Sequence, residues 1–189
     1  MAKVAIMGSD GSMGRLLAKF ALGDGELEVV AAFTVDVSPN VGTDIGILAS
    51  GTASGVTIQP MEYFKEIMES SRPDVLIDFT LPEGTETSTK WAITEGFPAV
   101  IGTTGLSEGF LSWVAQAAEE KNVTVVISSN FAMGMNIFFK VSAELAKLLP
   151  GWDVEIIETH HHRKRDSPSG TALRIASGIA KALEVDLEE

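Results

Sequence analysis

The chain of 189 residues contains no cysteine, which excludes disulfides, a thiolate nucleophile and cysteine-ligated zinc. Basic residues are also scarce, with 14 Lys and Arg against 26 Asp and Glu and a formal net charge of -12. Nucleic-acid binding needs lysine and arginine clustered over a surface, so nucleic acid is not an expected partner. No apolar run approaches the ~20 residues that span a bilayer, and the N-terminus lacks the longer apolar core and cleavage site of a signal peptide. We therefore expect a soluble, globular, cytoplasmic protein that does not bind membranes.

Short apolar runs alternate with helical patterns along the chain, a rhythm that predicts a parallel sheet. Strands are expected at residues 4–7, 27–33, 75–79, 99–101, 123–127 and 154–157. Helices are expected at 13–22, 61–70, 83–95, 108–121, 135–149 and 172–183. The predicted fold class is α/β, a Rossmann-type doubly wound parallel sheet built from the first five strands. Residues 35–60 show no clear period and are expected to cross the sheet edge as an irregular excursion.

A domain change is expected near residues 128–136, where a small polar segment follows the fifth strand and leads into a long amphipathic helix. The prediction is a dinucleotide-binding domain at 1–129 and a substrate-binding, catalytic domain at 130–189. One helix, one strand, a basic motif and a further helix cannot close a sheet. The second domain is therefore expected to be an α+β domain that is incomplete at its C-terminal end.

Three glycines, Gly8, Gly11 and Gly14, lie directly after the first expected strand and open the first expected helix. In this context glycines allow the backbone to approach a pyrophosphate, which then lies at the positive end of the helix. The alternative is a strand-to-helix turn without a ligand. An acidic residue ~20 positions on would bind the ribose, and Asp36 is the best-placed candidate, with Thr34 nearer the strand end. This indicates a nicotinamide dinucleotide; NAD is tolerated, and NADP remains open.

Small polar residues follow three further strands, at 78–82, 102–105 and 128–131. Ligands of open α/β sheets bind at the carboxyl ends of the strands, so these segments are candidates for a nicotinamide pocket. Ordinary turn chemistry is the alternative for 102–105.

The segment 158–172 holds all three histidines of the chain together with Arg163, Lys164 and Arg165. A strongly basic segment in an acidic chain indicates a locally held anion, here a small carboxylate substrate. Metal binding is disfavoured, because neighbouring residues on a strand point to opposite faces and three cations would flank the ion. A solvated basic loop is the other alternative. The roles of Arg163 and Arg165 stay open between substrate, coenzyme and solvent.

The favoured interpretation of this motif is acid chemistry beside an anion site. A histidine can donate a proton near neutral pH, and Lys164 can bind or polarise a carboxylate. Ser169, Gly170 and Thr171 are predicted to form a small anion nest, in which Ser169 or Thr171 caps the following helix. Asp166 is expected to orient the loop or pair with Lys164.

Five motifs together resemble one known family. They are Gly-x-x-Gly-x-Met-Gly-Arg at 8–15, Asp-Phe-Thr at 78–80, Gly-Thr-Thr-Gly at 102–105, Asn-Phe at 130–131 and Glu-x-His-His-x-x-Lys-x-Asp-x-Pro-Ser-Gly-Thr-Ala at 158–172. Over essentially its whole length the chain resembles the 4-hydroxy-tetrahydrodipicolinate reductase (dihydrodipicolinate reductase) family. The resemblance implies reduction of 4-hydroxy-tetrahydrodipicolinate to tetrahydrodipicolinate by NADH or NADPH, in lysine and diaminopimelate biosynthesis, with a homotetramer as the full-length form.

The resemblance also implies roles for individual residues. His160 would be the proton donor and Lys164 the second catalytic residue, while His161, Gly170 and Thr171, with Ser169 beside them, would hold the substrate carboxylates. The coenzyme would contact two groups of residues: Gly8, Ser9, Asp10, Gly11, Ser12 and Met13 at the pyrophosphate, and Gly102, Thr103, Thr104, Ser128, Ser129, Asn130 and Phe131 around the nicotinamide.

Two departures from the family pattern matter. Members usually carry an acid at the position of Thr34, and they continue well beyond residue 189 with strands that complete the second sheet and build the tetramer interface. We therefore expect a shortened form whose activity is open. The alternatives are a non-catalytic dinucleotide-binding module, an inactive fragment of the reductase and, with less support, an enzyme similar to aspartate dehydrogenase.

Overall fold

The computed structural model describes the whole chain except residues 161, 163, 165–166 and 188–189. Internal packing divides the chain into two compact units, Met1–Ile127 and Ser128–Glu189, which we call the first and second units. Each unit is described by itself below.

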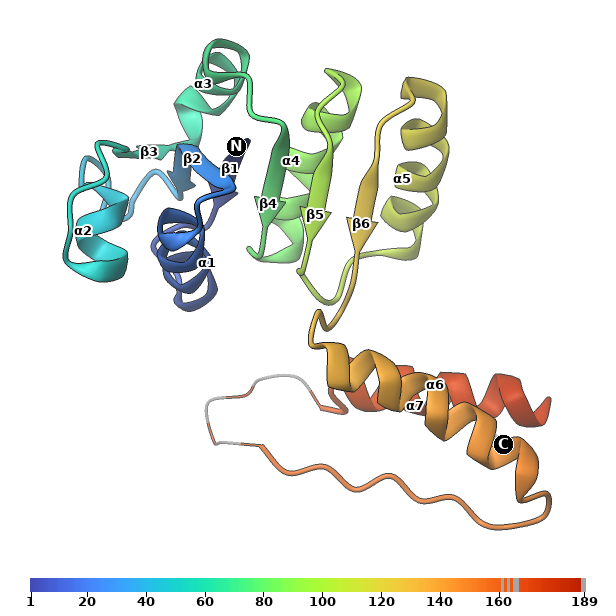
Figure 1. Cartoon of the computed structure of the whole chain (residues 1–189). Helices are drawn as coiled ribbons and strands as arrows, with labels where there is room; N and C mark the ends of the chain where they lie inside the picture. Colours follow the sequence, from blue (N-terminus) through green and yellow to red (C-terminus); the bar gives the residue numbers. More distant parts are fainter. Residues whose placement is uncertain (161, 163, 165–166, 188–189) are drawn as a thin grey trace. The chain divides into compact units, whose positions relative to one another are not determined.

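The first unit contains a parallel six-stranded sheet in the order β3-β2-β1-β4-β5-β6 (Figure 1). Its strands are β1 Ala2–Met7, β2 Leu27–Thr34, β3 Ile58–Pro60, β4 Val75–Asp78, β5 Ala99–Ile101 and β6 Val125–Ile127. This order reverses direction between β1 and β4, as in doubly wound dinucleotide-binding folds, and opens a crevice at the carboxyl ends of those strands. The predicted fold class is confirmed.

Helices cover both faces of this sheet. They are α1 Ser12–Gly23, α2 Ile45–Ser50, α3 Phe64–Ser71 preceded by a 3₁₀ turn η1 Met61–Tyr63, α4 Pro82–Thr94 and α5 Glu108–Lys121. Side chains of β1 alternate between the faces because successive strand residues point in opposite directions. Val4 and Ile6 pack with α1 and α2, whereas Ala5 and Met7 pack with α3 and α4.

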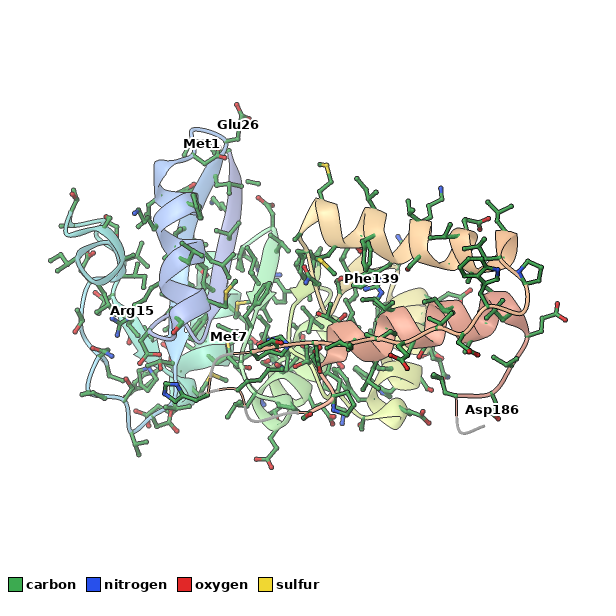
Figure 2. The ribbon with its side chains drawn as sticks, turned by 90° about the horizontal axis from the view of Figure 1, so that it is seen from below. Met1, Met7, Arg15, Glu26, Phe139 and Asp186 are labelled. Atoms are coloured by element: carbon green, nitrogen blue, oxygen red, sulfur yellow. The ribbon has the colours of Figure 1, made fainter. Side chains whose placement is uncertain are left out.

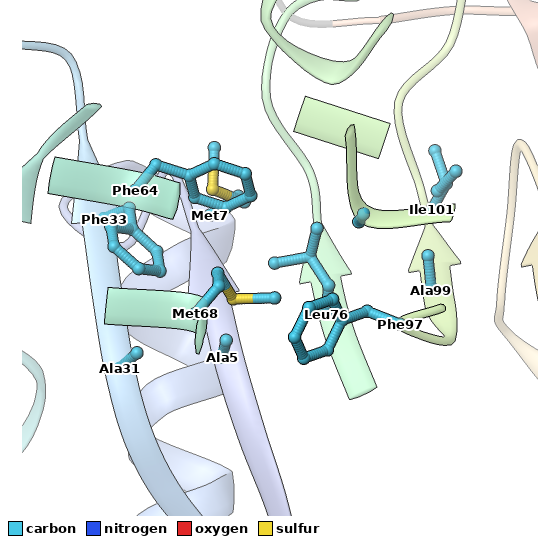
Figure 3. Packing of buried hydrophobic residues seen from close by; sticks show 11 residues of the cluster. Ala5, Met7, Ala31, Phe33, Phe64, Met68, Leu76, Phe97, Ala99 and Ile101 are labelled. Atoms are coloured by element: carbon cyan, nitrogen blue, oxygen red, sulfur yellow. The ribbon is translucent and has the colours of Figure 1, made fainter. Parts of the chain in front are cut away.

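Aromatic side chains fill the core between the sheet and the α3–α4 face (Figure 3). The Phe33 and Phe64 rings meet edge to face with centroids 5.1 Å apart, and Phe64 meets Trp91 in the same way at 5.2 Å. Phe97 stacks on Trp91 at 5.7 Å. Phe33 and Phe64 are buried, and full burial of such a side chain contributes roughly 1.5–3 kcal/mol by removing it from water. This core supports the strands whose ends form the crevice.

Residues 35–60 are more ordered than the sequence predicted, since they contain α2 and the edge strand β3. Asp44 organises the segment. Its carboxylate accepts the amides of Gly46 at 2.8 Å and Ile47 at 3.1 Å at the start of α2, and the amide of Gly55 at 2.7 Å across the loop. Hydrogen bonds from Ser54, Ile47 and Gly55 hold the pKa of Asp44 well below its usual value. Both elements are too short to produce a hydrophobic period.

The second unit is a pair of packed helices, α6 Met133–Leu148 and α7 Gly170–Leu183 (Figure 1). Their buried contacts are mostly small, with Ala146, Ala172 and Ala180 beside Ile179. The strand predicted at 154–157 is wrong, because these residues belong to neither a strand nor a helix. A strand needs a neighbour to share its backbone hydrogen bonds, and the described part of this unit supplies none.

No helix in the described part of the chain is both long and apolar enough to cross a bilayer.

Candidate functional site

A pocket of ≈ 420 Å³ lies at the carboxyl edge of the sheet, where the loops after β1, β2 and β4 meet. Its lining includes Gly8, Asp10 and Gly11 from the glycine loop, Thr34 from β2 and Thr80 after β4. Figure 2 shows Met7 and Arg15 at this end of the first unit, with Met1 and Glu26 at the other. The pocket therefore occupies the position where doubly wound sheets bind dinucleotides.

The glycine loop is packed so tightly that two of its positions admit no side chain. A Cβ on Gly14 would lie 2.1 Å from the carbonyl oxygen of Gly8. Gly8 itself has a φ of +62°, and a Cβ there would lie 2.7 Å from the Thr80 methyl group. The backbone of the loop is thus exposed to whatever enters the pocket. This is the geometry that a pyrophosphate requires.

Helix α1 begins directly behind this loop. Gly11 is its N-cap and has no side chain with which to cap it, so the first-turn amides depend on solvent or a ligand for a partner. Ser12 and Met13 are exposed residues of this first turn. Ser9 is buried and donates its hydroxyl to the carbonyl oxygen of Phe33 at 3.0 Å, which ties the loop to β2.

Asp10 points from the glycine loop toward the end of β2. Its carboxylate accepts hydrogen bonds from the Thr34 hydroxyl at 2.5 Å, the Ser38 hydroxyl at 2.5 Å and the Asn40 amide at 3.2 Å. Partial burial raises the pKa of Asp10, but the hydrogen bonds from Ser38, Thr34 and Asn40 outweigh it and bring the pKa below its usual value. A negative charge is therefore fixed at this end of the pocket. Sequence reasoning assigned Asp10 to the pyrophosphate and missed this network.

Asp36, the expected ribose ligand, is exposed, and its carboxylate accepts the Glu62 amide at 3.2 Å. Thr34 is buried beside Asp10 and lines the pocket. Thr34 therefore lines the pocket, whereas Asp36 is not among the described lining residues.

The loops after β4 and β5 are joined by a buried hydroxyl network around Asp78. Its carboxyl group, fully buried, accepts the hydroxyls of Thr85 at 2.9 Å and Ser88 at 2.8 Å, together with the amide and hydroxyl of Thr80. Thr85 in turn bonds the Thr103 hydroxyl at 2.7 Å. Thr103, predicted at the nicotinamide, is thereby held to β4. The sequence signal for this network was an acidic residue, Asp78, at the end of an apolar strand.

Gly102 must be a glycine, because a Cβ there would overlap the Phe79 ring at 1.9 Å. The ring of Phe79 lines the pocket on the β4 side. Thr104, the third residue predicted in this loop, is exposed.

Ser128–Phe131, predicted around the nicotinamide, belong to the second unit and form a turn that also accepts hydrogen bonds from Asn136 of α6 and Arg174 of α7. The Ser128 hydroxyl donates to the Asn130 carbonyl oxygen at 2.7 Å, and the Asn130 side chain accepts the Ala132 amide at 2.9 Å. Ser129 is half-buried and Phe131 is exposed. The turn leads directly into α6.

In the basic motif, one carboxylate connects a histidine to the start of a helix. Glu158 accepts both the amide of Ser169, at 2.7 Å, and its hydroxyl. The same carboxylate lies 2.8 Å from Nε2 of His160. Hydrogen bonds from the Ser169 side chain and backbone, followed by that from His160, lower the pKa of Glu158 to about 2. His160 is thus held beside an ionised carboxylate.

The predicted N-cap of α7 is confirmed for Ser169, whose hydroxyl oxygen accepts the Ala172 amide at 3.0 Å. Gly170 and Thr171 form the first turn, both half-buried. Lys164 is half-buried as well. His161, Arg163, Arg165 and Asp166 lie outside the described residues.

A second pocket, of ≈ 340 Å³, adjoins this motif and is lined by Ile156, Glu158, Pro168 and Ala172 among others. The described residues contain no group of three or more His, Asp or Glu side chains arranged to hold a metal ion.

Two family models match the chain in succession. Residues 2–131 match the model described as dihydrodipicolinate reductase, N-terminus, and residues 134–188 match dihydrodipicolinate reductase, C-terminus. The chain belongs to the dihydrodipicolinate reductase family. In terms of this family, the glycine-loop pocket falls in the N-terminal segment and the basic motif in the C-terminal one.

Similar proteins carry the corresponding name. The 4-hydroxy-tetrahydrodipicolinate reductase of Methanocaldococcus jannaschii is 43% identical over 179 residues, which cover 95% of this chain and 65% of that protein. That of Archaeoglobus fulgidus is 42% identical over 182 residues, covering 96% and 66%. The solved dipicolinate-bound dihydrodipicolinate reductase from Paenisporosarcina sp. TG-14 is 30% identical with a TM-score of 0.75, covering 96% of this chain and 66% of its own. The chain thus spans about two thirds of the length of these relatives.

Proposed function

We propose that this chain carries the coenzyme site and catalytic motif of an NAD(P)H-dependent reductase. The reaction is the reduction of 4-hydroxy-tetrahydrodipicolinate to tetrahydrodipicolinate, in lysine and diaminopimelate biosynthesis. The observation that carries the proposal is the family match over both segments, which brings a dinucleotide-type pocket and the 158–172 motif into one chain. A solved relative described as dipicolinate-bound supports a small cyclic dicarboxylate as the substrate class.

The first unit would bind the coenzyme. Gly8 to Met13 would hold the pyrophosphate against the first turn of α1, and Gly102 to Thr104, with Ser128 to Phe131, would surround the nicotinamide. Bound NADH or NADPH supplies the hydride. Support comes from the tight glycine loop, where Gly8 and Gly14 admit no side chain. Residues 1–129 would form the coenzyme domain and residues 130–189 part of the substrate domain.

The basic motif would supply the proton and hold the substrate. The 4-hydroxyl group must leave as water, and hydride addition to the resulting unsaturated ring leaves an anion that must be protonated at carbon, so an acid beside the ring is required. His160 would donate this proton, oriented by Glu158, with Lys164 as the second catalytic residue. His161, Ser169, Gly170 and Thr171 would bind the two carboxylates, and the α7 N-terminus favours such anions.

Cytoplasmic localisation and a homo-oligomer, a tetramer in the full-length form, complete the proposal. A biosynthetic role, as in the named relatives, supports the first. The second rests on the resemblance described above.

The direct test follows coenzyme oxidation by absorbance, with freshly generated 4-hydroxy-tetrahydrodipicolinate and either NADH or NADPH. Substrate-dependent oxidation is expected from the wild-type chain. His160→Asn should lower turnover roughly 100-fold or more, the usual contribution of a positioned general acid. His162→Asn, two residues away and exposed, is the matched control and should retain activity.

Unchanged turnover in His160→Asn would remove this histidine from the mechanism. Binding of the coenzyme without any substrate-dependent oxidation would instead indicate a binding module that does not catalyse the reaction.

A further inference from the structure

Asp10 and Glu83 are the charged residues among the described lining of the glycine-loop pocket, and both are acidic. Between Lys19 and Lys65 the sequence contains no lysine or arginine, and this interval includes all of β2, α2 and β3. The same interval contains acidic residues at 24, 26, 28, 36, 44 and 62, none of which is among the described residues that line the pocket. Within the glycine loop, Arg15 donates Nε to the main-chain oxygen of Asp10 at 2.7 Å, which ties that side chain to the backbone.

Asp10 brings a carboxylate to the end of β2, the place where doubly wound folds receive the ribose of the adenosine. The family resemblance described above implies an acid at position 34, where this chain has a threonine. The Thr34 hydroxyl donates a hydrogen bond to Asp10. The Asp10 carboxylate therefore places a negative charge beside Thr34, whose own side chain is uncharged. Ser38 and Asn40 fix the second carboxylate oxygen.

These three donors also leave room for a further interaction. Ser38 and Asn40 donate to Oδ2 of the carboxylate and Thr34 donates to Oδ1, so a ribose hydroxyl that enters the pocket can also donate to Oδ1. A 2'-phosphate has no such proton to give at neutral pH, and it carries negative charge toward a carboxylate that is only half-buried and lines the pocket.

We propose that Asp10 is the residue by which this chain discriminates between coenzymes, and that it selects NADH over NADPH. The inference rests on the proposed function, because it assumes that the pocket binds a nicotinamide dinucleotide. Like charges brought together without a counter-ion are strongly unfavourable, and the β2–β3 side of the pocket provides no basic residue to offset them. The carboxylate's own network of hydroxyl and amide donors keeps it in place.

The test measures dissociation constants for NADH and NADPH separately by calorimetry, without substrate. The wild-type chain should bind NADH roughly tenfold or more tightly than NADPH. Asp10→Asn keeps the size of the side chain and removes its charge, so NADPH affinity should rise until the two constants approach each other. Glu26→Gln removes a charge from an exposed carboxylate at the opposite end of the first unit and should leave the ratio unchanged.

Equal binding of both coenzymes by the wild type, or an unchanged ratio in Asp10→Asn, would overturn the inference while leaving the proposed function intact. Binding of neither coenzyme by the folded wild-type chain would overturn both. The wild type alone provides a second measurement, should the variant not fold. Raising the salt concentration should screen the repulsion and increase the affinity for NADPH relative to NADH, and a ratio insensitive to salt would count against Asp10.

Discussion

At the scale of single residues, the Glu158 side chain joins His160 to the start of α7. Its pKa is lowered from 4.5 to about 2, chiefly by the hydroxyl and amide of Ser169 and then by His160. Because the pKa of Glu158 is lower in the folded state than in the unfolded state, the ionised carboxylate stabilises the folded state. Its stabilising effect is therefore complete above pH 4.5 and is lost as the pH falls toward 2.

Glu158→Gln should lower the melting temperature at neutral pH, because the amide cannot accept all of the hydrogen bonds made by the carboxylate. Melting curves of wild type and variant across the acidic range are the measurement. The difference between them should shrink as the pH falls from about 4.5 to about 2. Glu155→Gln, in the same exposed segment, is the control and should show no such convergence. A difference that stays constant across this range would contradict the assignment.

The sequence predicted which segments carry the site residues more readily than it predicted which residues these side chains contact. The glycine loop and the 158–172 motif were evident from spacing, and the Ser169 cap follows from the preference of serine for helix starts. Asp10 is different, because its role depends on Ser38 and Asn40, about thirty residues away, and on where β2 delivers them. Local pattern carries no information about such contacts.

At the scale of elements, the junction of β1, glycine loop and α1 is held by backbone-to-backbone packing. Gly14 lies inside α1, where glycine is normally unfavourable relative to alanine. Here the helix touches the loop so closely that the carbonyl oxygen of Gly8 occupies the space of a Cβ. Glycine at this position lowers the intrinsic stability of the helix, but it allows the helix and the loop to contact each other.

Gly14→Ala should therefore destabilise the protein by about 1–3 kcal/mol, the range for inserting an atom into a packed site, and weaken NADH binding by displacing the loop. Gly23→Ala, at the other end of the same helix, is the matched control, because an added Cβ there meets nothing within 4 Å. Urea unfolding and calorimetry would measure both effects. Equal stability of the two variants would show that α1 can move away from the loop at little cost.

Five strands of the sheet were predicted, including the edge strand β6, and the other edge strand, β3, was not. The predicted strand at 99–101 coincides with β5, whereas the three-residue edge strand β3 was missed. The error at 154–157 has the opposite cause. Alternating apolar residues favour a strand only when a neighbouring strand completes its hydrogen bonds, and that condition cannot be read from the segment itself.

At the scale of the whole molecule, the described chain has a well-packed first unit and a smaller helical second unit. Phe64 lies beside Phe33 in the aromatic core of the first unit (Figure 3). Its ring also contacts the ring of Trp91. The strands that it supports, β1 and β2, carry the glycine loop and Thr34 at their ends. Core stability and the coenzyme pocket are therefore linked.

Phe64→Ala should cost about 3–5 kcal/mol, the range for removing a buried aromatic side chain. Chemical unfolding followed by circular dichroism would measure the loss. Phe20→Ala provides the matched control, because that side chain is 66% exposed on α1 and its removal should change stability by less than about 0.5 kcal/mol. Similar effects of the two substitutions would mean that the aromatic cluster contributes little to folding.

The overall architecture of the first unit was predictable because α/β alternation and a glycine loop after the first strand constrain strand order strongly. The second unit was not, because two helices and an irregular segment leave many arrangements open.

The hydroxyl network around Asp78 has a consequence for motion as well as for shape. Thr80, Thr85 and Ser88 all donate to one buried side chain, and Thr103 joins them from the neighbouring loop. Rupture of any one bond would leave a buried polar group short of a donor, which is unfavourable in a low-dielectric interior. The loops after β4 and β5 should therefore open together, as one cooperative fluctuation, and stay closed on the timescale on which exposed loops move freely.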